Sequence, residues 1–329
     1  MKFTGQLGVI AGVLLLAGCN GGGSSDSPAN TGTASFDVTD APVDGVSTVK
    51  VTFDGIALKP KEGSQITIDF DTPVTIDNLL DLTGNASAPV LGDTTVEAGE
   101  YNYIRLFVVG GTPDSLVEED NGQQFPLFIP GQQPQSQSQA RRFLQLSSPF
   151  VVPAGGNADF TIDVELRKAL TKPSGQNHYL LRPSLRLVNN AEVGTIEGTV
   201  DATLLNDPSC TNNIPDDEGH SVYLYSAHDA DIGDVNVDIN GDGDHSSDDT
   251  DGVTPESNPL TLANVKFDSN TAEYRYQIGF VAAGDYTIAF TCQSLDDLPE
   301  SDENIAFVGA SNIQVSANST TEHDFAASP

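Results

Sequence analysis

The sequence predicts an all-β protein with two consecutive antiparallel β-sandwich domains. Three observations lead to this fold class. Apolar and polar side chains alternate along many short segments, as they do in half-buried strands. Glycine and proline, with 31 and 19 residues, separate these segments, and no long stretch has the apolar spacing of an amphipathic helix. The length of 329 residues exceeds that of an average single domain, so two domains are expected.

The N-terminal residues are expected to be a lipoprotein signal peptide (1–18) and a flexible tether (19–32). An apolar run at 7–17 is too short to cross a bilayer as a helix, which favours a signal peptide. The letters LAGC, which end at Cys19, resemble the lipobox of bacterial lipoproteins. This resemblance implies cleavage before Cys19 and acylation of that residue, and Asn20 in the next position implies the outer membrane. The alternative is a plain secretory signal with an unrelated cysteine.

Residues 33–190 are expected to form the first sandwich. Side-chain alternation places Phe36 and Val38 on one strand face, and a short helical turn is expected within 75–84. The polar segment 131–142 is interpreted as a mobile loop, with a contact loop as the alternative. The predicted strands are, in order, 34–42, 47–58, 64–70, 72–77, 99–110, 158–167 and 179–188.

Residues 194–327 are expected to form the second, smaller sandwich. The charge distribution supports a boundary near residue 190, because 26 acidic residues but only two basic ones follow Gly194. The segments VEAGEYNYI (96–104) and VAAGDYTIA (281–289) share residues in register, so both domains are expected to use the same hairpin. The predicted strands are 194–205, 220–227, 273–281, 284–292, 304–317 and 320–327.

Three blocks of the first domain carry a family resemblance. The segments 35–60, 96–106 and 160–170 resemble a family of bacterial envelope lipoprotein domains known only as domain of unknown function 4382. The resemblance implies a β-sandwich on a secreted lipoprotein and offers no catalytic residues to transfer. The second domain resembles, more loosely, transthyretin-like and carboxypeptidase-regulatory-like sandwiches.

Two cysteines remain besides Cys19. An exported protein enters an oxidising compartment, so Cys210 and Cys292 are expected to form a disulfide. Two separate buried thiols are the alternative.

The segment DINGDGDHSSDD, residues 238–249, is the candidate metal site. It resembles the calcium loops of EF-hands and dockerins, which place oxygen ligands at alternate positions around a glycine. Asp249 stands where a longer Glu is usual, His245 replaces an apolar residue, and no helix is evident on either side. Calcium is therefore expected, with a solvated acidic loop or another metal as alternatives. The candidate ligands are Asp238, Asn240, Asp242, Asp244, Ser246 and Asp249.

The remaining polar groups are interpreted as structural. His220, His228 and His245 are expected on the surface, because their spacing matches no zinc pattern. A transition-metal site built from these imidazoles and aspartates is the alternative. The basic group Arg167, Lys168 and Lys172 is expected to offset nearby acids, with a glycan or anion contact as the alternative. The alternating tyrosines are interpreted as sheet residues, with a sugar platform as the alternative. These are Tyr223, Tyr225, Tyr274 and Tyr276.

Composition and motifs limit the function. A net charge of −33 without a basic stripe excludes nucleic acid as a partner. No hydrolase, metalloprotease, P-loop or dinucleotide-binding motif is present, so no enzyme activity is expected. The expected function is a non-enzymatic cell-envelope lipoprotein that acts as a binding or scaffolding module, with an acidic loop ordered by calcium. The alternative is a carbohydrate-binding accessory lipoprotein. The expected partners are the membrane, through N-terminal acyl chains, and an envelope protein or glycan.

Overall fold

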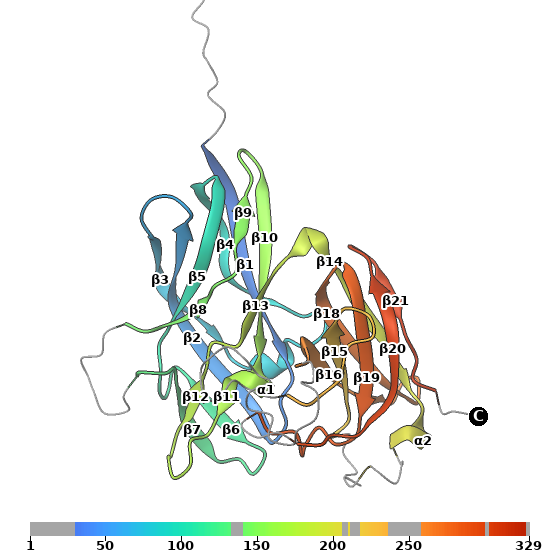
Figure 1. Ribbon diagram of the computed structural model, residues 1–329. Helices are drawn as coiled ribbons and strands as arrows, with labels where there is room; N and C mark the ends of the chain where they lie inside the picture. Colours follow the sequence, from blue (N-terminus) through green and yellow to red (C-terminus); the bar gives the residue numbers. More distant parts are fainter. Residues whose placement is uncertain are drawn as a thin grey trace, which may run out of the picture.

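The structure, a computed structural model, confirms the all-β fold class. Sheets fill two side-by-side parts of the molecule, one blue to green and one yellow to red (Figure 1). No helix of the residues described below is both long and apolar enough to cross a membrane. The structure describes residues 30–132, 141–205, 210, 218–235, 258–299 and 303–326.

The first part contains a four-stranded sheet in the order β13-β10-β1-β4 and a nine-stranded sheet in the order β11-β12-β7-β6-β2-β5-β8, with β3 on β2 and β9 on β5. The strands are β1 (Thr31–Ala41), β2 (Val46–Pro60), β3 (Ile66–Ile76), β4 (Ala88–Glu97), β5 (Gly99–Val108), β6 (Leu116–Glu119), β7 (Gln124–Phe128), β8 (Phe143–Leu146), β9 (Phe150–Val152), β10 (Asn157–Glu165), β11 (Leu170–Thr171), β12 (Tyr179–Leu181) and β13 (Leu185–Asn189). The helical turns are η1 (Leu79–Asp81), α1 (Leu166–Ala169) and η2 (Asn190–Glu192). The short helical turn expected within 75–84 is therefore present.

The core of this part follows the alternation read from the sequence. Phe36 on β1 stacks on Phe160 of β10, with ring centroids 5.4 Å apart, and Phe150 of the other sheet meets Phe36 edge-on. All three rings are almost fully buried. The aromatic cluster therefore joins the two sheets face to face.

The second part contains two four-stranded sheets, β17-β18-β14-β21 and β16-β15-β19-β20. Their strands are β14 (Val193–Val200), β15 (Ser221–Ser226), β16 (Thr261–Asn264), β17 (Lys266–Asp268), β18 (Glu273–Ala282), β19 (Gly284–Thr291), β20 (Phe307–Val315) and β21 (Thr320–Glu322), with the helical turn α2 (Ala202–Leu205). Ile196, Ile278, Ile288 and Phe290 pack between the sheets and are almost fully inaccessible to solvent.

The strand pairing departs from a purely antiparallel arrangement. Among the described strands, β1 and β10, β7 and β12, and β14 and β21 run parallel. The chain between β1 and β10 passes through the opposite sheet before it returns, which is the long connection that a parallel pair needs.

The repeated segments at 96–104 and 281–289 form corners and not hairpins, so the hairpin prediction is wrong. β4 and β5 belong to different sheets, and so do β18 and β19. At each corner a tyrosine hydroxyl donates to the carbonyl four residues earlier: Tyr101 to Glu97 at 2.6 Å, and Tyr286 to Ala282 at 2.8 Å. The shared residues thus form the same kind of corner in both parts, where the chain passes from one sheet to the other.

The two parts meet in close contact. The Asn85 amide donates to Gln277 Oε1 at 3.2 Å, and Thr195 Oγ1 donates to Asn85 Oδ1 at 2.8 Å. A Cβ atom on Gly279 would lie 2.0 Å from the carbonyl oxygen of Gly84, so only glycine fits there without movement of the backbone. The loop after η1 is therefore seated directly on β18.

Candidate metal centre

The predicted calcium loop lies outside the described residues. This applies to all six candidate ligands between 238 and 249, and also to His245 and Cys19. The calcium prediction therefore stays a prediction for the loop itself.

Three carboxylates that the sequence did not single out converge beside the start of that loop. They are Asp234, Asp297 and Glu303, and one oxygen of each lies within 4.8 Å of the others. Asp234 follows β15, four residues before Asp238, while Asp297 and Glu303 lie between β19 and β20. Asp234 and Asp297 are buried, and Glu303 is half-buried.

Hydrogen bonds fix these carboxylates. Asp297 accepts the Val235 amide at 3.0 Å and the hydroxyl of Tyr223, and Asp234 accepts the Glu303 amide at 2.7 Å. A backbone amide of each segment thus donates to a carboxylate of the other segment. These hydrogen bonds position the carboxylate oxygens without any bound ion. Such preorganisation reduces the cost of binding.

Burial dominates the electrostatics of Asp297. It is the main reason why the pKa of Asp297 is raised, and the Tyr223 hydrogen bond and the positive charge of Arg167 oppose it. Arg167 reaches across from α1, where it pairs with Asp44 and donates to the carbonyl of Ser294. The positive charge of Arg167 therefore acts on Asp297 and is shared with Asp44.

The donor set suits a hard cation. Calcium takes oxygen ligands at about 2.3–2.6 Å, so two ligands of one ion lie at most roughly 5 Å apart. The carboxylates of Asp234, Asp297 and Glu303 meet this limit. Calcium needs six to eight oxygens, and these three supply part of that number.

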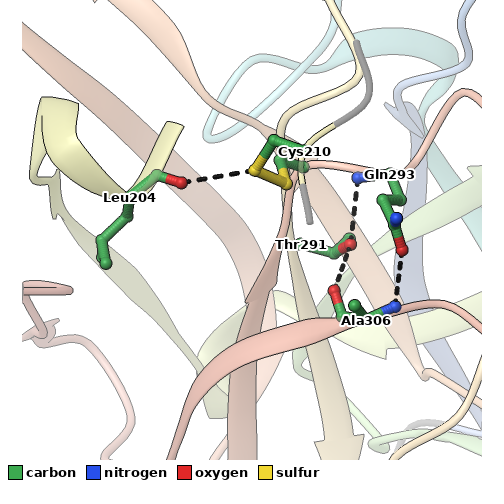
Figure 2. Close-up of a disulfide and its surroundings, with 6 residues drawn as sticks. Leu204, Cys210, Thr291, Gln293 and Ala306 are labelled. Atoms are coloured by element: carbon green, nitrogen blue, oxygen red, sulfur yellow. Dashed lines mark hydrogen bonds between the residues drawn. A yellow bond between two sulfur atoms is a disulfide. The ribbon is translucent and has the colours of Figure 1, made fainter. Parts of the chain in front are cut away.

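The predicted disulfide is present (Figure 2). Cys210 and Cys292 are bonded, with Cα atoms 5.3 Å apart, and Cys292 is fully buried at the end of β19. Gln293 donates its amide to Thr291 Oγ1 and accepts the Ala306 amide at its own side-chain oxygen. The bond thus pins the segment that precedes Asp297.

The other sequence-selected groups are structural. Tyr223, Tyr225 and Tyr276 are core residues, and Tyr274 is half-buried against Phe267. His220 is buried, so its placement on the surface is wrong: it lies beside the ring of Phe290. His228 is partly exposed, as expected.

The basic group pairs with acids, as expected, and it also contacts the second part of the molecule. Lys172 pairs with Glu119 at 2.6 Å, and Arg167 pairs with Asp44. Arg167 is also buried between the two parts, and the half-buried Lys168 donates to the carbonyl of Pro259 there. No sequence signal showed that their partners would come from the second part.

Comparisons with known proteins leave the activity open. Residues 31–183 match the family model described as Domain of unknown function (DUF4382). No curated protein sequence matches the chain.

Among solved structures, the TIE protein of Bacillus anthracis is 9% identical, with 89% of this chain and 33% of that chain covered and a TM-score of 0.18. This chain thus spans about a third of that protein. The minor pilin GBS52 of Streptococcus agalactiae is 9% identical, with coverage of 90% and 98% and a TM-score of 0.16. The major pilin subunit of Bacillus cereus is 10% identical, with coverage of 90% and 69% and a TM-score of 0.18. These TM-scores are too low to transfer a fold or a function.

Proposed function

We propose that this protein is a non-enzymatic, calcium-ordered binding or scaffolding module of the cell envelope. The observation that carries the proposal is the convergence of Asp234, Asp297 and Glu303 within 4.8 Å. The cluster adjoins a run of the chain that is rich in aspartate and contains the calcium-like motif. A divalent cation would relieve the repulsion between these carboxylates and tie the segment after β15 to the segment before β20.

The proposal includes a lipid anchor at Cys19. The LAGC sequence supports acylation of this residue, and several acyl chains on one cysteine would hold the protein at the outer membrane. The mass of the mature N-terminal peptide tests this point, because an unmodified peptide that begins elsewhere would exclude the anchor.

Calcium binding is tested by thermal unfolding with added calcium and with chelator. An ion that binds only the folded state raises the midpoint, by a free energy of about 1.4 kcal/mol at ten times the dissociation constant. Asp234→Asn and Glu303→Gln should reduce the calcium-induced rise, and so should Asp242→Ala in the predicted loop. Asp231→Asn is the matched control, because Asp231 is exposed in the same segment as Asp234.

Two results would contradict the calcium proposal in different ways. An unchanged midpoint of the wild-type protein at millimolar calcium would exclude a stabilising ion altogether. A rise that survives Asp234→Asn and Glu303→Gln but disappears in Asp242→Ala would place the ion in the loop alone.

A second candidate function is that of a carbohydrate-binding accessory protein. It is favoured by Phe267, a residue that is 46% exposed and lines a cavity between the two parts of the molecule. Exposed aromatic rings next to hydrogen-bonding groups are suited to the apolar faces of sugars. A glycan array tests this function, and an array without any signal would exclude it.

A further inference from the structure

A cavity opens at the seam between the two sandwiches. Its volume is about 390 Å³, which lies in the range of small-molecule sites, roughly 300–1,000 Å³. The first sandwich lines it with the ends of β8 and β10, with α1 and with β13. The second sandwich lines it with the end of β15 and with residues 258–260. A ligand in this cavity would therefore contact both sandwiches.

Lys168 on α1 is the first of two cations that line the cavity, in a chain whose net charge is −33. It is half-buried, donates to the Pro259 carbonyl and forms no ion pair with any described residue. Its pKa is lowered mainly by burial, because its positive charge is poorly solvated there. An anion beside Lys168 would compensate for this loss of solvation.

Arg186 on β13 is the second cation. Its Nη2 donates to Asp163, and this is the single hydrogen bond that its five donors form within the described part of the chain. Its Nε is enclosed, but 15% of the side chain remains exposed, and the side chain lines the cavity. The terminal nitrogens of Arg186 are therefore the ones that can donate to a ligand.

Glu165 is the one acidic residue among the described residues of the cavity wall. Burial, followed by the charge of Asp163, raises its pKa to about 8, so Glu165 is uncharged at neutral pH. Asp163 lies outside the wall and compensates for one of the two cations, Arg186. One positive charge, that of Lys168, is then left for a ligand.

The rest of the wall is divided between hydroxyl groups and apolar side chains. Ser148, Ser184 and Ser226 contribute hydroxyls, which can donate to an anion beside the two cations. The apolar side chains come from both sandwiches and would be covered by a hydrocarbon chain. They are Leu146, Leu185, Leu187, Pro259 and Leu260.

We propose that this cavity binds a small monocarboxylic acid with an apolar chain. The carboxylate accepts hydrogen bonds from Lys168 and Arg186, and the chain packs against the leucines. A single uncompensated positive charge suits a monoanion better than a phosphate dianion, and the apolar wall disfavours strongly hydrated inorganic anions. Neither calcium nor a saccharide takes part in this site, so its failure would leave the proposed functions unaffected.

The test is a calorimetric titration of the protein with butanoate, hexanoate and octanoate. At least one of these carboxylates should bind. 1-Hexanol, which lacks the charge, and inorganic phosphate, which lacks the apolar chain, should bind at least about tenfold more weakly. The carboxylate that binds most tightly is then titrated into the variants.

Two variants change the charge of the cavity. Lys168→Met should weaken binding by about 10- to 100-fold, because it removes a charge-assisted hydrogen bond. Ser226→Glu should weaken it by about tenfold, because it places a negative charge at the exposed rim of the cavity. The matched controls are Lys172→Met and Ser174→Glu, since both residues are exposed and neither lines the cavity.

Each outcome decides for or against the site. Loss of affinity in both variants, with both controls unchanged, supports it. An equal loss in the controls, or unchanged affinity in either variant, overturns the site. No binding of any of the three carboxylates overturns the proposal, and phosphate or 1-hexanol that binds as tightly as the carboxylate overturns the ligand class. If Lys168→Met does not fold, as judged by its thermal transition, Ser226→Glu decides alone, because Ser226 is exposed.

Discussion

Replacement of Glu165 by glutamine should change how stability depends on pH. Glu165 ends β10 and is 4% exposed between the two sandwiches. Its pKa is raised to about 8, mainly by burial and then by the charge of Asp163, which together outweigh the attraction of Lys168 and Arg186. The charged and titratable groups that face it are Asp40 from β1, Asp163 on β10 itself, Lys168 from α1 and Arg186 from β13.

The size and sign of the effect follow from linkage. The ordinary pKa is 4.5, so between pH 4.5 and about 8 the folded protein holds a proton that the unfolded chain releases. The free energy of unfolding therefore falls as the pH rises through this window and loses up to about 5 kcal/mol by pH 8. Glutamine has no proton to lose, so Glu165→Gln should unfold with a similar free energy to the wild type near pH 4.5 and a higher one above pH 8.

Urea unfolding between pH 4.5 and 9 measures this difference. Glu322→Gln is the matched control, because it removes an exposed carboxylate from β21. A difference between Glu165→Gln and the wild type that is the same at pH 5 and pH 9 would contradict the raised pKa of Glu165.

Two further changes test the junction and the disulfide. Gly279→Ala should destabilise the protein by about 1–3 kcal/mol, because the new Cβ would meet the Gly84 carbonyl at 2.0 Å. Gly92→Ala, where a Cβ meets nothing within 4 Å, is its control in thermal unfolding, and equal transitions would contradict the close contact. Joint replacement of Cys210 and Cys292 by serine should lower the free energy of unfolding by about 4.5 kcal/mol in the chain-entropy model, since the bond spans 82 residues. A loss below 1 kcal/mol in urea unfolding would contradict that estimate.

Local alternation was enough to place most strands. The alternating residues of segment 99–110, for example, predict a strand, and β5 covers Gly99–Val108. Alternation fixes the face of each side chain but not the neighbour of each strand. The parallel pairing of β1 with β10 and the corners at Tyr101 and Tyr286 depend on contacts between distant segments, so they were not predicted.

The candidate site shows the same limit. Asp234 belongs to an aspartate-rich run that can be recognised in the sequence. Asp297 lies more than 60 residues further along the chain, among ordinary turn residues, so nothing in the sequence marks it as a partner of Asp234. Antiparallel pairing of β15 with β19 places the segments that follow these strands at opposite ends of the pair, so the chain after β15 has to fold back before Val235 can reach Asp297. The burial of Arg167 between the sandwiches could not be predicted from the sequence either, because a charged residue is most often exposed.

The position of β1 has a mechanical consequence. It begins at Thr31, is hydrogen-bonded to β10 on one side and β4 on the other, and ends at the junction between the sandwiches. A pull on the chain ahead of Thr31 therefore loads both ladders along their length, so many hydrogen bonds must shear together before the strand slips. The same strand would carry tension from Thr31 to the place where the two sandwiches meet.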